Sequence, residues 1–234
     1  MRRFVLFFIL LVMAFFGFIQ SPFFAVTEVE VRGAVSMKAG EVLEASGLAL
    51  PANFFSVNAG RIAGTLQKAP RIERVSVRRL LPNHVIITVK ERAPLGAIPL
   101  GKEFLIFDSY GIVMAVAEGL QGSRVPIVTG VSLSSAQPGE TLHDPGAELA
   151  RRILLATDSA TRLELSEIHV GDPQKLRVYT RRGITVLLGD SADLAKKMSR
   201  FSGVLGDLRK KGWHPEIIDV RTPDSPVVKV RGRS

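Results

Sequence analysis

The 234-residue chain contains no cysteine, so it can form no disulfide and offers no thiolate for nucleophilic catalysis or metal binding. The missing cysteine does not identify the compartment, because exported proteins are not obliged to contain disulfides. It does exclude the small disulfide-stapled scaffolds, and the fold must therefore rest on hydrophobic cores.

Recognisable catalytic and cofactor motifs are also missing. The chain has no Gly-x-Ser-x-Gly elbow, no P-loop and no dinucleotide-binding glycine run. Its histidines are scattered and lack the paired spacing of a metal site: His84, His143, His169 and His214. Asp108, Asp190 and Asp219 fall where turns and strand ends commonly place aspartate. The sequence therefore predicts no catalytic residue, no metal site and no cofactor.

Acidic residues are in deficit. The chain has 22 Asp and Glu against 31 Lys and Arg, which gives a formal charge of +9. Such a charge suits nucleic acid, anionic lipid or acidic protein segments, and topology must decide between them. The basic clusters are interpreted as solvated faces. Lys196 and Lys197 in particular are expected to face solvent, opposite a stripe formed by Leu194 and Met198.

One long hydrophobic run stands at the N-terminus. Residues 4–24 carry no charge and amount to about 30 Å of helix, which is enough to cross a bilayer. Arg2 and Arg3 precede the run and place the N-terminus in the cytoplasm. A cleaved signal peptide is the alternative, but its best cleavage point, after Ala25, has the bulky Phe23 two positions earlier. An uncleaved anchor is favoured, and either reading puts the remaining chain outside the cytoplasm, away from nucleic acid.

A β-hairpin is predicted over residues 72–92. Val75 and Val77 share one face with the alternating apolar residues of the second strand, on the far side of a turn at residues 81–83. A strand over 26–33, a short helix over 36–47 and a second helix beginning at Asn58 come before it. The order strand, helix, helix, strand, strand predicts a three-stranded sheet covered by two helices, which resembles the POTRA domain.

The remaining chain predicts a second, mostly antiparallel β domain with two helices. A hairpin is expected at residues 104–116, short strands at 125–130, 164–170, 176–180 and 184–188, and helices at 146–157 and 191–211. Two final strands are expected at 217–221 and 227–230. Pro223 and Pro226 precede the last strand and favour a sheet edge, where proline is tolerated.

Taken in this order, the segments resemble the FtsQ/DivIB family of bacterial cell-division proteins. The resemblance rests on the strand Val75-Ser-Val-Arg-Arg79 with its Leu-Pro-Asn turn, on Val89-Lys-Glu-Arg-Ala-Pro94, and on the terminal Ile218-Asp-Val-Arg221. It implies an α+β fold with a single transmembrane helix at 4–24, a cytoplasmic tail at 1–3, a β-α-α-β-β POTRA domain at 25–94 and an FtsQ-type β domain at 95–232. The three-residue tail is shorter than is usual in the family. Either the start codon is misassigned, or this member makes little use of contacts in the cytoplasm.

The resemblance also implies a function without catalysis. A member of this family is a single-pass inner-membrane protein at the division septum that links early and late division proteins and joins FtsB and FtsL. The implied FtsB site is the C-terminal edge of the β domain, where a strand is added: Arg221, Val227, Val228, Lys229 and Val230. A second implied contact region lies on the POTRA strand: Arg74, Val77 and Arg79.

Two other functions remain open from the residues alone. One is a membrane-anchored enzyme acting on the cell wall, which would need converging carboxylates or a Ser/Lys pair that the sequence does not offer. The other is a POTRA module of protein translocation, which normally precedes a long β-barrel, and this chain lacks the length and the alternation for one.

Overall fold

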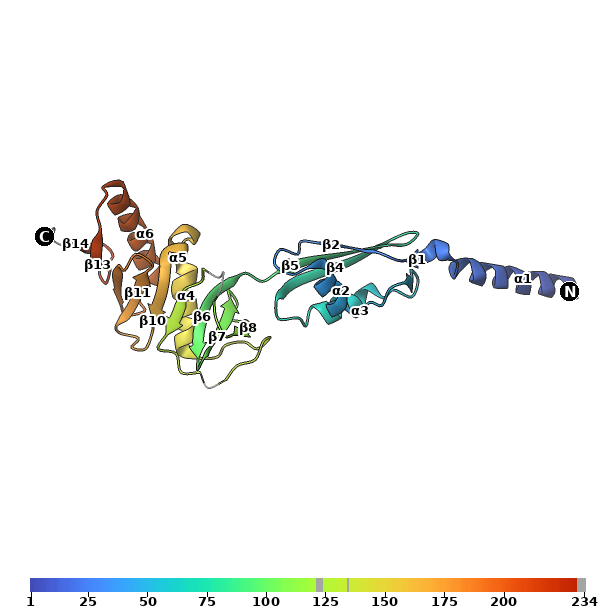
Figure 1. Ribbon diagram of the computed structural model, residues 1–234, viewed down its shortest axis with the longest axis horizontal. Helices are drawn as coiled ribbons and strands as arrows, with labels where there is room; N and C mark the ends of the chain where they lie inside the picture. Colours follow the sequence, from blue (N-terminus) through green and yellow to red (C-terminus); the bar gives the residue numbers. More distant parts are fainter. Residues whose placement is uncertain (121–123, 134, 231–234) are drawn as a thin grey trace. The chain divides into compact units, whose positions relative to one another are not determined.

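The computed structural model describes residues 1–120, 124–133 and 135–230, and the chain divides into two compact units, Met1–Arg92 and Ala93–Ser234 (Figure 1). The residues at 231 and 232, which the sequence assigns to the end of the β domain, lie outside the described residues. Each unit has its own hydrophobic core. The fold is therefore α+β in two parts, as the sequence predicts.

The first unit begins with helix α1, Arg2–Ile19, which is apolar after Arg2 and Arg3 and contains no buried residue. The sequence predicts a helix to Phe24, but the structure ends it at Ile19 because Pro22 cannot continue the helical hydrogen bonding. A 3₁₀ turn, Pro22–Phe24, follows, and Phe24 is buried in the core of the first unit. At 18 residues, α1 is about 27 Å long, and it remains long and apolar enough to cross a membrane.

The POTRA-type fold follows with the predicted order of elements. Its sheet has the order β2-β5-β4, with β2 at Val29–Arg32, β4 at Ile72–Leu80 and β5 at His84–Glu91. Helices α2, Ala39–Ser46, and α3, Ala59–Leu66, supply buried side chains to its core. A short pair of strands, β1 at Ala25–Val26 and β3 at Ala52–Asn53, was not anticipated from the sequence.

The caps of these helices follow the sequence signals. The Asn58 side chain accepts a hydrogen bond from the Arg61 amide at 3.0 Å, as an N-cap should. Val57 and Ile62 are both buried, as a hydrophobic staple requires. Gly47 ends α2 with a φ of 66°, a left-handed conformation that glycine adopts without strain. The predicted hairpin is present and pairs Val75 with Val89, and its turn contains a cis Leu81–Pro82 bond.

The second unit is built on one nine-stranded sheet with the order β14-β13-β12-β11-β10-β9-β6-β7-β8. The strands are β6, Pro94–Leu100; β7, Glu103–Asp108; β8, Val113–Ala117; β9, Ile127–Thr129; β10, Leu165–His169; β11, Leu176–Thr180; β12, Thr185–Gly189; β13, Pro215–Asp219; and β14, Val227–Val230. Pairing is mostly antiparallel; β9 is parallel to both β6 and β10, and β12 is parallel to β13.

Three helices accompany this sheet: α4, Pro145–Ala156; α5, Ser159–Glu164; and α6, Leu194–Lys210. The sequence predicts the first and last but not α5, whose six residues are too few to show helical periodicity. Asp158 caps α5 at the amide of Thr161, and its other carboxylate oxygen accepts from Ser202 of α6. The hydrogen bond from the Ser202 hydroxyl has the largest effect on the pKa of Asp158. Together with the hydrogen bonds from the α5 amides, and against the opposing effect of burial, it lowers this pKa to about 2.

The two faces of the sheet differ in character. One row of side chains across the strands is almost fully buried in the core: Val128, Ile168, Val178, Val186 and Ile218. The adjacent row faces the other way and is half-buried or exposed: Thr129, His169, Arg177, Leu187 and Asp219. Burying each aliphatic side chain of the first row contributes about 2 kcal/mol, which holds the strands in register.

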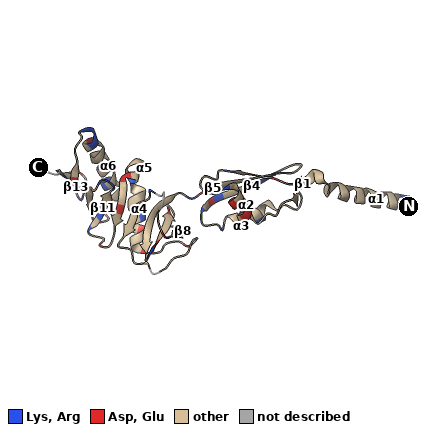
Figure 2. Ribbon diagram, viewed as in Figure 1, with Lys and Arg blue, Asp and Glu red and all other residues tan. Residues whose placement is uncertain are grey.

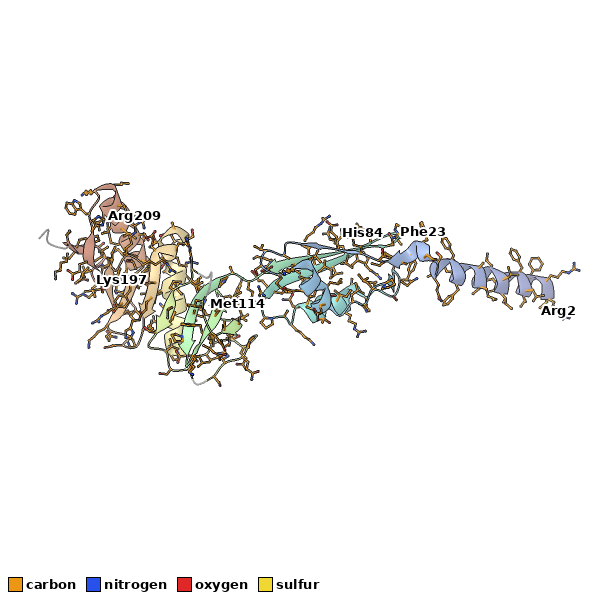
Figure 3. The ribbon with its side chains drawn as sticks, viewed as in Figure 1. Arg2, Phe23, His84, Met114, Lys197 and Arg209 are labelled. Carbon is orange, nitrogen blue, oxygen red and sulfur yellow. The ribbon has the colours of Figure 1, made fainter. Side chains whose placement is uncertain are left out.

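Lys197 corrects one expectation. Lys197, labelled in Figure 3, is only 3% exposed. Its Nζ donates to the Asp190 carboxylate at 2.7 Å and to the Asp190 carbonyl at 3.0 Å. Lys196 does lie in solvent, where it pairs with Asp224 at 3.0 Å. The two lysines therefore do not share a solvent face, because the long stem of Lys197 continues the apolar stripe while its ammonium reaches Asp190.

Candidate partner-binding site

Strand β14 forms one edge of the nine-stranded sheet, as its position after two prolines predicts. Among the described residues it pairs with β13 alone, in antiparallel register. An edge strand carries backbone N–H and C=O groups on its outer side that no neighbouring strand satisfies. The residues of β14 that turn those groups outward can be identified from the strand pairing.

The pairing of β13 with β12 fixes which residues of β13 face β14. The Val220 amide donates to the Leu187 carbonyl of β12 at 3.0 Å. Since successive residues of a strand direct their N–H and C=O groups to opposite sides, Ile218 also faces β12. Ile217 and Asp219 must then direct theirs toward β14.

The register carries this alternation onto β14. Ile217 lies opposite Lys229, and Asp219 lies opposite Val227, so these two pairs exchange hydrogen bonds between the strands. Val228, between them, has its N–H and C=O directed away from β13 and toward the open edge. An incoming strand would therefore bond first to the backbone of Val228.

The side chains of β14 point to both faces of the sheet. Val227 is 64% exposed, while Val228 is partly buried and packs against the core. The ammonium of Lys229 lies 3.7 Å from the carboxylate of Glu216 on β13. Val230, the last described residue, lies opposite Pro215 and is also exposed. The edge is thus apolar on both faces, with one paired lysine.

Helix α6 holds the loop that leads into β14. The Arg200 side chain donates to the Pro223 carbonyl at 2.8 Å, and Lys196 pairs with Asp224. These contacts fasten residues 222–226 to a helix that is itself packed into the core. The edge strand is consequently presented in a fixed position before any partner arrives.

Arg221 lies two residues beyond β13 and is already paired. Its Nη2 donates to Asp219 Oδ2 at 2.6 Å, its Nε donates to both carboxylate oxygens at 3.0 Å, and its own amide donates to Oδ1. The Arg221 guanidinium lowers the pKa of the Asp219 carboxyl, so the pair stays ionised at neutral pH. Its aliphatic stem lies against Gly189, where a Cβ would approach the Arg221 Cγ to 3.0 Å. The side chain is still 62% exposed and retains free N–H donors for a second carboxylate.

Asp219 has a role in this site that its position at the end of a strand does not by itself indicate. The available signal was its position two residues before Arg221, because residues at that spacing share one side of an extended chain and oppositely charged ones can pair.

The residues named on the POTRA strand do not lie together. Arg74 is opposite Lys90 on one face of the sheet, whereas Val77 and Arg79 belong to the other face, with Val75. Arg79 donates to the Val57 carbonyl at 2.7 Å and lies over the ring of Phe54, 5.6 Å from its centroid. Strand β4 is an edge of its sheet, and basic residues mark β4 and β5 (Figure 2).

Chemistry of the catalytic kind is sparse. Within the described ranges, no three His, Asp or Glu side chains are grouped so that they could hold a metal ion. One cluster of polar side chains is centred on Thr129, whose hydroxyl lies 2.6 Å from Glu167 and 2.9 Å from His169 Nδ1. These three side chains are aligned by the parallel pairing of β9 with β10 and satisfy one another.

Comparison with known families accounts for both units. Residues 24–92 match the family described as the FtsQ-type POTRA domain, and residues 98–221 match the C-terminal domain of the cell division protein FtsQ/DivIB. The second match alone spans more than half of the chain. The chain belongs to the FtsQ/DivIB family. The resemblance drawn from the hairpin and from the terminal Asp-Val-Arg segment is confirmed.

Members of this family align with most of the chain. A cell division protein DivIB of Clostridium tetani is 25% identical over 217 residues, covering 91% of this chain and 82% of its own. A cell division protein FtsQ of Anaeromyxobacter sp. is 28% identical over 223 residues, covering 92% of this chain and 74% of its own. These matches make it a cell-division protein that works with other division proteins, and α1 fits its single membrane anchor.

Proposed function

We propose that this protein is a non-enzymatic, single-pass component of the division machinery that links early and late division proteins by binding FtsB and FtsL. The observation that carries the proposal is the outward-facing backbone of Val228 on the edge strand β14. A strand of FtsB would add to this edge and extend the sheet by one strand.

Strand addition at β14 suits the described geometry in two respects. Main-chain hydrogen bonds to Val228 would supply affinity, while the exposed Val227 and the partly buried Val228 would select apolar residues on alternate faces of the added strand. The strand needs no rearrangement to receive a partner, because contacts with α6 already hold the loop before it. Preorganisation of this kind lowers the entropic cost of binding.

Arg221 would add a charge-assisted contact beside this edge. Its guanidinium is hydrogen-bonded to Asp219 but has further N–H donors. A carboxylate on the partner could bind these donors while the Asp219 pairing remains in place. The electrostatic contribution is therefore smaller than an unpaired arginine would give.

The proposal places the chain at the cytoplasmic membrane of the division septum. Helix α1 would be the anchor, with residues 1–3 in the cytoplasm and both folded units outside it. The POTRA-type unit, from residue 25 to 94, would offer Arg74, Val77 and Arg79 as a second region. These side chains lie on two faces of β4. A single partner could therefore contact all three only if it bound along the open edge of this strand.

Capture of FtsB by paired variants tests the proposal. Val228→Pro removes one outward N–H but none of the N–H groups that bond to β13, so the edge strand itself remains. Val228→Ala is the matched control, since it keeps the N–H and trims only the side chain. We expect full-length Val228→Pro to lose capture of FtsB from solubilised membranes and Val228→Ala to retain most of it. If the two variants capture equal amounts of FtsB, strand addition at β14 is ruled out.

Depletion of the protein tests the broader role independently. Cells that lose a division protein of this class should continue to grow without septa and become filaments. Normal division after depletion would contradict the divisome role itself, whatever the binding experiment shows.

A further inference from the structure

A pocket lies at the end of α6. It is lined by residues from the turn between β11 and β12, from α6, and from the segment that leads into β13 with the first residue of that strand: Arg182, Ile184, Leu205, Leu208, Arg209, Trp213, His214 and Pro215. Trp213 is the only tryptophan of the chain and is 53% exposed. A large exposed aromatic beside converging cations is uncommon on a surface that has no partner.

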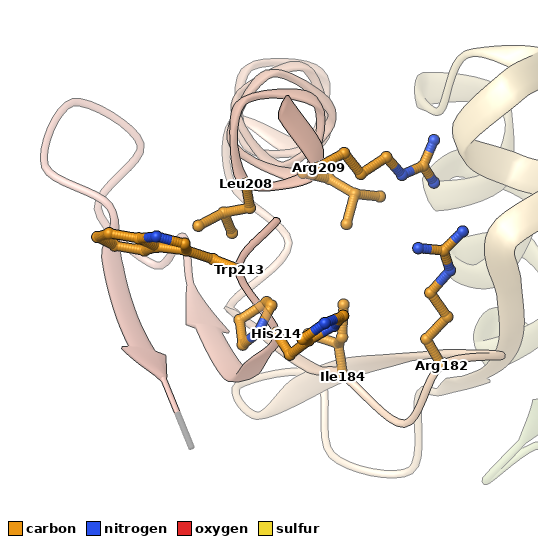
Figure 4. A pocket seen from close by; sticks show the side chains of 8 residues that line it. Arg182, Ile184, Leu208, Arg209, Trp213 and His214 are labelled. Atoms are coloured by element: carbon orange, nitrogen blue, oxygen red, sulfur yellow. The ribbon is translucent and has the colours of Figure 1, made fainter. Parts of the chain in front are cut away.

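We propose that this pocket binds an acidic peptide segment, with one side-chain carboxylate between Arg182 and Arg209 and a neighbouring apolar side chain on Trp213. In Figure 4 the two guanidiniums lie near one another on one side of the pocket, and the Trp213 indole lies on the other side. Ile184 and Leu208 form an apolar wall between them. The pocket thus joins a cationic end to an apolar end.

The charges around this pocket are not balanced. Arg209 Nη2 lies 3.0 Å from Glu164 Oε2, and Arg182 Nε lies 3.5 Å from the same oxygen, so two guanidiniums share one carboxylate. Lys210 has only a long contact of 3.9 Å with Asp207. Lys211 lies over the Trp213 ring, 5.5 Å from its centroid, and adds a cation to the rim. Four cations against two carboxylates leave a net charge of +2 for an acidic partner to neutralise.

The size of the pocket limits what it can hold. Its volume is about 50 Å³, which is room for a group of one or two water molecules' size, such as a carboxylate. The two converging guanidiniums match a carboxylate better than an uncharged sugar ring. A membrane surface is also disfavoured, because the cations and the indole line a concave site rather than a flat face.

This inference does not depend on strand addition at β14. The pocket residues lie in the β11–β12 turn, on α6 and around the start of β13. Pro215 pairs with Val230, but none of the pocket residues belongs to the edge strand itself. Failure of the peptide experiment would therefore leave the FtsB proposal standing, and the reverse also holds.

Trp213 provides a direct measurement, because it is the only tryptophan of the chain and lines this pocket. The full chain would be placed in nanodiscs of zwitterionic lipid and titrated with a capped hexapeptide, Glu-Leu-Glu-Glu-Leu-Glu, with the Gln-Leu-Gln-Gln-Leu-Gln peptide as its control. We expect a saturable change in Trp213 emission with the acidic peptide only. Arg182→Gln or Arg209→Gln should weaken binding at least fivefold, and Lys175→Gln, an exposed cation elsewhere, should not.

Glu164→Gln separates binding from a loss of folding. It removes the carboxylate that competes for both guanidiniums, so the proposal requires tighter peptide binding, by about threefold or more. A destabilised variant would not gain affinity. The proposal is overturned if Glu164→Gln binds no better, if the glutamine peptide binds equally, or if only nanodiscs of anionic lipid change the Trp213 emission.

Discussion

Asp219 holds the guanidinium of Arg221 through three hydrogen bonds, the shortest of 2.6 Å between Arg221 Nη2 and Asp219 Oδ2. This pairing changes how the arginine should be tested. Arg221→Glu would place two carboxylates together, and their repulsion would disturb the end of β13 as well as any partner contact. Substitutions that separate the two effects are needed.

Arg221→Gln and Asp219→Asn form such a pair. Arg221→Gln removes the charge without adding repulsion, and we expect FtsB capture to weaken by about two- to tenfold, as for a charge at an interface rim. Asp219→Asn leaves Arg221 charged and releases it for the partner, so capture should be equal to or stronger than that of the unmodified protein. Affinities measured on the full chain decide the matter: if both variants weaken capture equally, the pair serves only the local structure.

The pH dependence of this pair has a defined sign. Because Arg221 lowers the pKa of Asp219 in the folded state, the pairing stabilises the fold above the ordinary Asp pKa and is lost as pH falls below it. We therefore expect the difference in capture between the unmodified protein and Asp219→Asn to be constant from pH 8 to about pH 5. A difference that changed within that range would contradict the assignment.

Lys197 should contribute to stability far more than its neighbour Lys196. Lys197→Ala deletes a buried stem and leaves a cavity, for an expected loss of about 2 kcal/mol in the free energy of unfolding. Lys197→Met keeps the stem and should stay within about 1 kcal/mol of the unmodified protein. Lys196→Ala, the solvent-exposed control, should change stability by no more than about 0.5 kcal/mol. Urea unfolding followed by Trp213 fluorescence, which lies in the same unit, measures all three; equal losses at 196 and 197 would refute the buried placement.

Glu91 should fasten the loop before α2 over most of the pH range. Burial acts to raise its pKa, but the Ser36 hydroxyl and the amides of Met37, Val35 and Ser36 donate to the carboxylate and lower the pKa to about 2. The stabilisation is therefore complete above pH 4.5 and disappears as pH falls through about 2. Glu91→Gln should cost about 1 kcal/mol at pH 7.

Nuclear magnetic resonance of the Ser36 amide tests the Glu91 assignment. Its chemical shift should titrate with a midpoint near pH 2 in the unmodified protein and should show no such titration in Glu91→Gln. A midpoint near 4.5, the ordinary value for glutamate, would mean that these amides do not hold the carboxylate in solution.

Helix α1 should anchor the chain, and the absence of cysteine makes its topology easy to measure. A single Lys175→Cys variant should react with a membrane-impermeant maleimide added to intact spheroplasts, whereas Arg2→Cys should react only after permeabilisation. Placing arginine at both Leu10 and Leu11 should release the protein from membranes, because each charge costs about 3 kcal/mol at a helix centre. Labelling of Arg2→Cys from outside would reverse the proposed orientation.

Periodicity predicted the elements whose side chains alternate strongly. The hairpin and its shared apolar face followed from the two-residue alternation, and the Asn58 cap followed from the chemistry of helix starts. Helix α5 was missed because six residues make less than two turns, and β1 and β3 because two residues show no pattern. The end of α1 was placed too late because Phe23 and Phe24 are as apolar as the helix itself, although Phe24 serves the folded core.

The edge position of β14 was predictable from the sequence, but the details of the candidate site were not. Two prolines before Val227 indicated an edge strand, and the sheet order bears that out. Which amide of that strand faces outward depends on its pairing with β13, which no local pattern contains. The buried state of Lys197 and the pairing of Arg221 with Asp219 likewise arise from contacts that composition cannot reveal.

Amide hydrogen exchange at β14 tests the central claim most directly. In the free protein the N–H groups of Val227 and Lys229 bond to β13 and should exchange slowly, while that of Val228 faces the open edge and should exchange fast. On addition of the extracytoplasmic part of FtsB, the account predicts strong protection of the Val228 amide with little change at its two neighbours. If FtsB binds and the Val228 amide continues to exchange at its free rate, strand addition at β14 is not how this protein captures its partner.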